Sequence, residues 1–212
     1  YTTNQQEKSK NVLLATTRYC FYFMLLITLP VIFLTEILLN MWLIDVPSYA
    51  VIFTRLIVVQ VLFQVFDSSF YIALYAKGRL VENAMISPVL GFIQFPILCY
   101  LFMEGYSPIV LSWTNMIIYF LLGIVIKPFL LKYVVQYNLL SVYKDLLLCA
   151  SVAVLSIMFP IIFILTFDLN LIQNSFLFLF ICIISTILSI WFIGLSKEEK
   201  EKIFFLAKKL KI

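Results

Sequence analysis

Long apolar runs separated by short polar connections are the feature that most restricts what this chain can fold into. Each run holds about 20 or more mostly apolar residues, enough for a helix to cross a hydrocarbon core of roughly 30 Å. The runs are Thr17–Asn40, Tyr49–Ala76, Asn83–Met103, Pro108–Leu131, Leu146–Phe167 and Leu171–Leu195. The sequence therefore predicts six transmembrane helices.

Positive charge is distributed unevenly over the polar segments. Except for Arg55, the basic residues form four clusters at the two ends and on alternate connections: Lys8, Lys10 and Arg18; Lys77 and Arg79; Lys127, Lys132 and Lys144; and the lysines from Lys197 to Lys211. The charged residues of the other connections are acids, namely Asp45, Glu104 and Asp168. Since lysine and arginine accumulate in cytoplasmic loops, we expect both ends of the chain to be cytoplasmic.

The composition favours lipid as the solvent. Hydrophobic residues make up 64% of the chain and charged residues 12%, which is more apolar than a soluble domain of this size can accommodate. Without water each segment must satisfy its own backbone, and the runs are continuous rather than alternating, so helices are expected and a β-barrel is not. We predict an all-α integral membrane protein. The net charge of +4 follows from the cytoplasmic clusters and does not indicate nucleic-acid binding.

Three segments are expected: a cytoplasmic loop (1–16), a six-helix transmembrane lobe (17–195) and a cytoplasmic tail (196–212). The chain starts at Tyr1 and its first residues contain no signal peptide, so we expect it to be a fragment of a longer protein.

Ser196 and Glu199, after the last run, have the spacing of a helix capping box. Further along, Ile203, Leu206, Ala207 and Leu210 share one helix face, which predicts an amphipathic tail on the inner membrane surface.

Residues typical of enzymes are scarce. The chain has no histidine, which removes most zinc sites and histidine-based acid–base chemistry. Its four cysteines, Cys20, Cys99, Cys149 and Cys182, lie in separate runs without paired spacing and are expected to be packing residues. We therefore expect no enzymatic activity, no metal and no cofactor.

Polar residues line one face of the second run. Gln60, Gln64, Asp67 and Tyr71 follow an i, i+4, i+7, i+11 pattern, which stacks them on a helix. Polar groups are costly at membrane depth and normally face a bundle interior or a watery cavity, so this face is a candidate substrate-contacting surface. The alternative is that these side chains only hydrogen-bond neighbouring helices.

Arg55 lies in the part of the second run that the charge pattern places near the outer surface. One interpretation is an arginine that extends to the outer lipid headgroups. The other is a fixed cation that holds an anionic substrate, because guanidinium donates two parallel hydrogen bonds to phosphate and stays charged.

Polar residues of two later runs are expected to join helices. Asn115 with Tyr119, and Ser185 with Ser189, are i, i+4 pairs that could face the bundle. Hydrogen bonding between helices is the usual role of such residues in membranes.

Several motifs follow one another over nearly the whole chain. They are Leu29-Pro30, Ile37-Leu-Leu-Asn-Met-Trp-Leu43, Pro47, Tyr75-Ala-Lys-Gly-Arg79, Pro96-Ile-Leu-Cys-Tyr100, Glu104-Gly-Tyr-Ser-Pro108 and Gly194-Leu-Ser-Lys-Glu-Glu-Lys200. In their order and spacing they resemble the motifs of bacterial polysaccharide flippases of the Wzx type. The first run and its exit resemble the seventh span of those proteins, and the middle and end of the chain resemble their later spans.

This resemblance implies the second lobe of a two-lobe transporter of the multidrug/oligosaccharidyl-lipid/polysaccharide exporter superfamily. Such proteins move undecaprenyl-pyrophosphate-linked oligosaccharide across the bacterial inner membrane, with cavity cations thought to hold the pyrophosphate. The resemblance also implies that Arg55 is one of these cations and that a missing N-terminal lobe is the partner of this chain. Two alternatives stay open: a drug or metabolite antiporter with Asp67 as its acidic residue, and a membrane assembly partner without transport activity.

Overall fold

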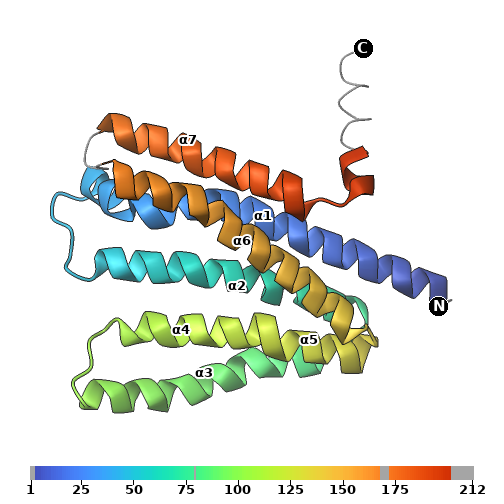
Figure 1. The fold of residues 1–212 in the computed structure, drawn as a ribbon. Helices are drawn as coiled ribbons and strands as arrows, with labels where there is room; N and C mark the ends of the chain where they lie inside the picture. The colour runs from blue at the N-terminus through green and yellow to red at the C-terminus, as the bar shows by residue number, and fades with distance from the viewer. Residues whose placement is uncertain (1–2, 79, 168–171, 202–212) are drawn as a thin grey trace. The chain divides into compact units, whose positions relative to one another are not determined.

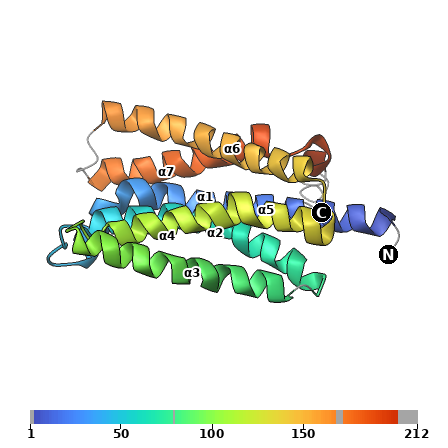
Figure 2. The same ribbon diagram turned by 90° about the horizontal axis from the view of Figure 1, so that it is seen from below.

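The computed structural model describes residues 3–78, 80–167 and 172–201, and within them the chain is helical with short turns and no β-strand (Figures 1 and 2). Its α-helices are α1 (Thr3–Trp42), α2 (Ala50–Ala76), α3 (Leu80–Met103), α4 (Val110–Phe120), α5 (Lys127–Leu130), α6 (Leu139–Thr166) and α7 (Ile172–Ser189). Three π-helical segments interrupt or extend them: η1 (Leu121–Ile126), η2 (Leu131–Val135) and η3 (Ile190–Gly194).

Six helical stretches in the described residues are long and apolar enough to cross a membrane. They are Glu7–Trp42, Ala50–Ala76, Ala84–Met103, Val110–Val135, Leu139–Thr166 and Asn174–Gly194. Each overlaps one of the apolar runs, so the predicted helical class and number of membrane-length helices are confirmed. The fourth stretch is a succession of α4, η1, α5 and η2.

The N-terminal residues that were expected to form a loop are instead helical from Thr3 onward, as the beginning of α1. The reason is an apolar segment that already starts at Val12 and continues into the first run, with Leu14 buried to 6% exposure. The hydroxyl of Tyr137 also donates to Ser9 Oγ over 3.3 Å, which ties the start of α1 to the segment after η2.

The chain forms two compact units, residues 1–145 and 146–212. In the first, α2 lies between α1 and α4, and α3 packs beside α4 (Figures 1 and 2). The buried Phe21 of α1 stacks on Phe66 of α2 with ring centroids 5.0 Å apart. Gln94 of α3 donates to Asn115 of α4 over 2.8 Å, which confirms the predicted interhelical role of Asn115.

The second unit contains the rest of α6, with α7 and η3. Ser185 of α7 donates to the carbonyl of Ser156 in α6 over 2.8 Å, so its predicted interhelical role is confirmed, whereas Ser189 bonds within its own helix. The rings of Phe163 in α6 and Phe178 in α7 also contact each other, with their centroids 5.8 Å apart. In lipid such contacts matter because close packing and hydrogen bonds, rather than the hydrophobic effect, hold helices together.

The capping box predicted after the last run is confirmed. The backbone N–H of Ser196 donates to Glu199 Oε2 over 2.7 Å, and the N–H of Glu199 donates back to Ser196 Oγ over 3.3 Å. The rest of the predicted tail, 202–212, lies outside the described residues, as do Arg79 and Asp168.

One contact in the first unit leaves no space for a side chain. Gly123 of η1 lies so close to α2 that an added Cβ would come 2.7 Å from the carbonyl oxygen of Phe63 and 3.1 Å from Phe66 Cβ. We expect Gly123→Ala to destabilise the protein by about 1–3 kcal/mol, because two backbones must separate. Thermal unfolding in detergent measures this effect.

Gly91 of α3 supplies the matched control, since a Cβ there would meet nothing within 4 Å. Gly91→Ala should leave stability unchanged or raise it slightly, because alanine is the better helix former. Equal unfolding temperatures for the two variants would contradict the close approach at Gly123.

Candidate functional site

The predicted polar face of α2 is partly exposed and lacks internal hydrogen bonds. Gln60 and Gln64 are half-buried, and neither side chain hydrogen-bonds another described residue. Ser68 and Tyr71, on the same side of the helix, are exposed. Unpaired amides are costly in lipid, so these side chains favour water or a partner outside this structure as their environment.

The same helix carries a buried ion pair, which α2 forms with α5. Lys127 Nζ lies 3.3 Å from Asp67 Oδ1, and the lysine side chain is 1% exposed while that of the aspartate is 16% exposed. The ammonium also lies over the ring of Tyr71, 5.3 Å from its centroid. Lysine and aspartate are rarely buried unless they are paired, and here each neutralises the other.

Lys127 lies at the end of a π-helical segment. The lysine follows η1, and its N–H bonds to the carbonyl of Leu122, five residues earlier. The next residue, Pro128, has no N–H to offer the carbonyl of Ile124. That carbonyl accepts the hydroxyl of Tyr143 over 3.1 Å. Single π-helical turns of this kind are frequent at functional sites.

The ion pair lies at a matching depth in the two helices. Asp67 is nine residues from the end of α2 and Lys127 eight from the end of η2, which at 1.5 Å per residue is about 12–14 Å in each case. The close approach of Gly123 to the backbone of Asp67 encloses the pair between the helices.

The charge pattern predicts Lys127 in a cytoplasmic cluster and does not indicate its pairing with Asp67. Two signals could have found it. Lys127 lies inside the fourth apolar run, ending at Leu131, rather than after it. An isolated carboxylate at membrane depth also requires a partner of opposite charge, and Lys127 is the base at the corresponding depth.

Arg55 is exposed and lies apart from the other predicted site residues. Nine residues separate it from Gln64, so it projects from roughly the opposite side of α2 at 3.6 residues per turn. Its Nε donates to the carbonyl of Ile32 in α1 over 3.1 Å. No described acid pairs with it, including the exposed Glu36 one turn further along α1, so the charge of its guanidinium is uncompensated.

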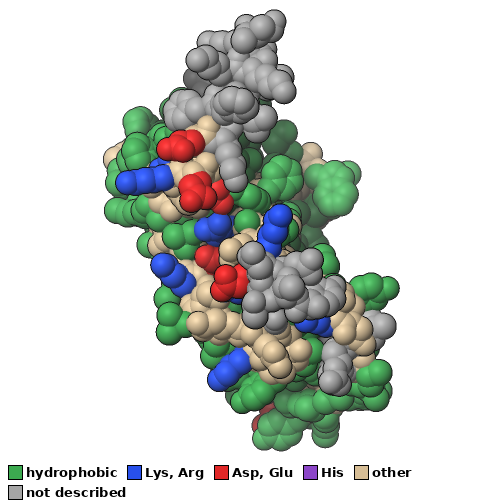
Figure 3. Space-filling view, turned by 90° about the vertical axis from the view of Figure 1, so that its right-hand side faces the viewer, with side chains coloured by type: hydrophobic (Ala, Val, Ile, Leu, Met, Phe, Trp, Pro, Cys, Tyr) green, Lys and Arg blue, Asp and Glu red, His purple; other side chains and the backbone are tan. Residues whose placement is uncertain are grey.

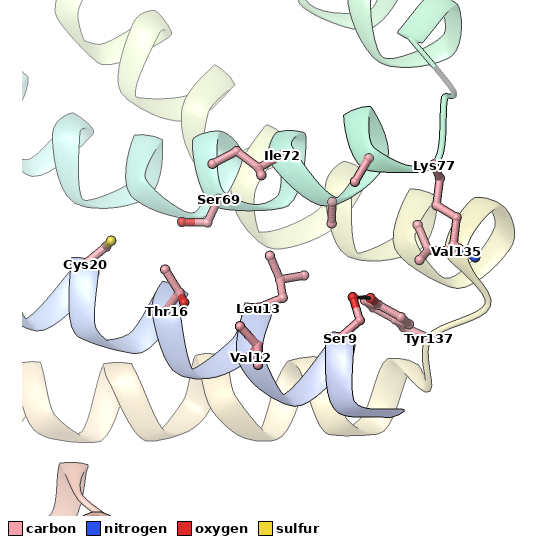
Figure 4. Close-up of a pocket in the computed structure, with 12 residues that line it drawn as sticks. Ser9, Val12, Leu13, Thr16, Cys20, Ser69, Ile72, Lys77, Val135 and Tyr137 are labelled. Atoms are coloured by element: carbon pink, nitrogen blue, oxygen red, sulfur yellow. Dashed lines mark hydrogen bonds between the residues drawn. The ribbon is translucent and has the colours of Figure 1, made fainter. Parts of the chain in front are cut away.

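Two hollows lie along the contact between α1 and α2. One, of about 310 Å³, runs from Ser9 and Lys77 to Cys20 (Figure 4). The other, of about 320 Å³, is shallower and is reached by Gln64 and Ser68. They share Cys20, Ser69 and Ile72 and therefore adjoin each other.

The predicted site residues are thus found in three places: Arg55 beside α1, Gln60 and Gln64 on the partly exposed face, and Asp67 with Tyr71 around Lys127. No protein-family model, curated protein or solved structure matches the chain. The fold and the site define a class: a helical protein whose described residues contain six membrane-length helices, with a polar face and a buried ion pair on the second.

Proposed function

We propose that this chain is the C-terminal six-helix lobe of a bacterial polysaccharide flippase. The protein would be multi-pass in the inner membrane, with both ends of the chain cytoplasmic, and would move undecaprenyl-pyrophosphate-linked oligosaccharide to the outer leaflet together with an N-terminal lobe. The resemblance of the sequence to such flippases and the six membrane-length helices support this proposal. The observation that carries it is the polar face of α2, whose amides have no described partner.

The chemistry of that face suits a sugar-containing substrate. The amide groups of Gln60 and Gln64 both donate and accept hydrogen bonds, as sugar hydroxyls do. Tyr71 adds an exposed aromatic ring and a hydroxyl. Arg55 supplies an uncompensated guanidinium, which suits the pyrophosphate. Because it projects from another side of α2, it would act at a different stage of substrate movement.

The antiporter alternative is less well supported by the geometry. An exporter of cationic cargo needs an acidic group that can face the cargo. Within α2 the acidic residue is Asp67. Its carboxylate lies against Lys127, so its charge is already neutralised.

Thiol labelling tests whether the face contacts water. In a variant without native cysteines, Gln60→Cys and Gln64→Cys should react with a charged maleimide reagent at least tenfold faster than Val58→Cys and Leu62→Cys. The first pair lies on the polar face, and the second lies on the opposite side of the helix. Equal rates at all four positions would remove the observation that carries the proposal.

The proposed activity itself is tested in cells. Deleting the gene should abolish surface polysaccharide and cause lipid-linked oligosaccharide to accumulate on the cytoplasmic side, where a membrane-impermeant probe for its sugars cannot reach it. The complete gene should restore export, whereas residues 1–212 alone should not, because alternating access requires a second lobe. Normal polysaccharide in the deletion strain would show that the proposed function is wrong.

A further inference from the structure

The hollow between the start of α1 and the end of α2 has the form of a binding groove for a chain-like apolar molecule. Its wall is mainly apolar (Figure 4). Tyr137 donates to Ser9 at one end, and the hydroxyl groups of Thr16 and Ser69 lie farther along the groove. The apolar lining residues are Val12, Leu13, Ile72, Ala73, Ala76 and Val135.

The groove lies at the end of the helices where the first apolar run begins. On α1 it extends from Ser9 to Cys20, and on α2 from Ser69 to Lys77, which is about 12–16 Å at 1.5 Å per residue. The first apolar run starts at Thr17 and Lys77 directly follows α2, so the Ser9 and Lys77 end of the groove lies at the membrane interface and the Cys20 end enters the hydrocarbon core.

One lysine lines the interfacial end of the groove, and two more are its near neighbours in sequence on α1. Lys77 lines the groove and extends along its edge toward Val135 (Figure 4). Lys8 lies one turn before Val12, and Lys10 follows Ser9. The acidic residue in this part of α1 is Glu7. Figure 3 looks toward the end at which α1 begins and shows basic and acidic side chains among polar atoms, bordered by hydrophobic ones. Lysines at an interface attract anionic lipid headgroups.

We propose that this groove binds one acyl chain of an anionic glycerophospholipid, with the lipid phosphate at Lys77. The ammonium group has three N–H donors, so it can contact the phosphate while keeping a contact within the protein. The lipid is a resident of the leaflet in which α1 begins and is distinct from the transported substrate. It stabilises the contact between α1 and α2 at the end where the groove separates their side chains.

Photo-crosslinking tests the proposal on the intact protein in lipid nanodiscs. The probes are phosphatidylglycerol and phosphatidylcholine carrying the same diazirine-labelled acyl chain, and crosslinked peptides are identified by mass spectrometry. Peptides around Val12 and Ile72 should be labelled about fivefold more by phosphatidylglycerol, the preference expected from one basic contact. Lys77→Gln should reduce this labelling to the phosphatidylcholine level.

Two further variants separate the headgroup contact from the acyl-chain contact. Lys132→Gln removes an exposed lysine that does not line the groove and should leave labelling unchanged. Thr16→Trp fills the groove from an exposed position and should abolish labelling by both lipids.

Three outcomes would overturn the proposal. Equal labelling of the wild-type protein by the two lipids would mean that the groove holds any acyl chain without selecting its headgroup. Unchanged labelling of Lys77→Gln would remove the phosphate contact. Displacement of the probe by polyprenyl pyrophosphate at equimolar concentration would make the groove a substrate site. The flippase proposal is independent of all three, since surface polysaccharide is measured separately.

Discussion

Replacing Lys127 by methionine should strongly destabilise the protein, and replacing Asp67 by asparagine at the same time should restore most of the loss. The single change leaves the Asp67 carboxylate between two packed helices without its cation. Removing one partner of a buried ion pair costs about 3–5 kcal/mol, whereas replacing both partners by uncharged residues is often nearly neutral. Thermal unfolding in detergent and the amount of protein in the membrane measure the difference.

Lys132→Met serves as the control, because Lys132 is exposed and lies five residues along the same helical stretch. It should have little effect on unfolding. If Lys127→Met unfolds at the wild-type temperature, or if the double variant is no more stable than Lys127→Met, the ion pair does not hold α2 to α5.

The helices of this fold were predictable because each is encoded locally. Twenty consecutive apolar residues specify a membrane-length helix without reference to the rest of the chain, and Ser196 with Glu199 specifies a helix start over four residues. The helical residues before Thr17 were not predicted. The polar residues at positions 3–11 resemble a loop when packing is unknown, while Leu14 is buried by tertiary packing that the local sequence does not reveal.

The candidate site was less predictable, because it depends on contacts between distant segments. Periodicity places Gln60, Gln64 and Asp67 on one side of a helix, but it does not reveal which neighbour each side chain meets. Asp67 and Lys127 are sixty residues apart in sequence and meet where Gly123 packs closely on α2 and a π-helical segment precedes the lysine. Neither π-helical geometry nor the partner of a charge follows from hydrophobic pattern alone.

Removing the charge of Arg55 should abolish surface polysaccharide while the protein accumulates normally in the membrane. Under the flippase proposal, its guanidinium contacts the pyrophosphate when the cavity opens outward. Charge-assisted hydrogen bonds contribute about 1.5–3 kcal/mol, so Arg55→Ala should weaken substrate affinity roughly tenfold or more. Arg55→Lys should be only partly active, since ammonium keeps the charge but loses the forked geometry. Export is measured as surface polysaccharide at matched protein levels.

The hydrogen bond from Arg55 to the Ile32 carbonyl offers a competing explanation, because it joins α2 to α1. Arg55→Gln separates the two roles: glutamine keeps an N–H donor for that carbonyl but carries no charge. If the charge matters, glutamine should be as defective as alanine. Full export with Arg55→Gln would assign the residue to helix packing. If lysine restores export fully, the arginine needs only to reach the lipid headgroups, as long cations near helix ends do, and the pyrophosphate contact would be rejected.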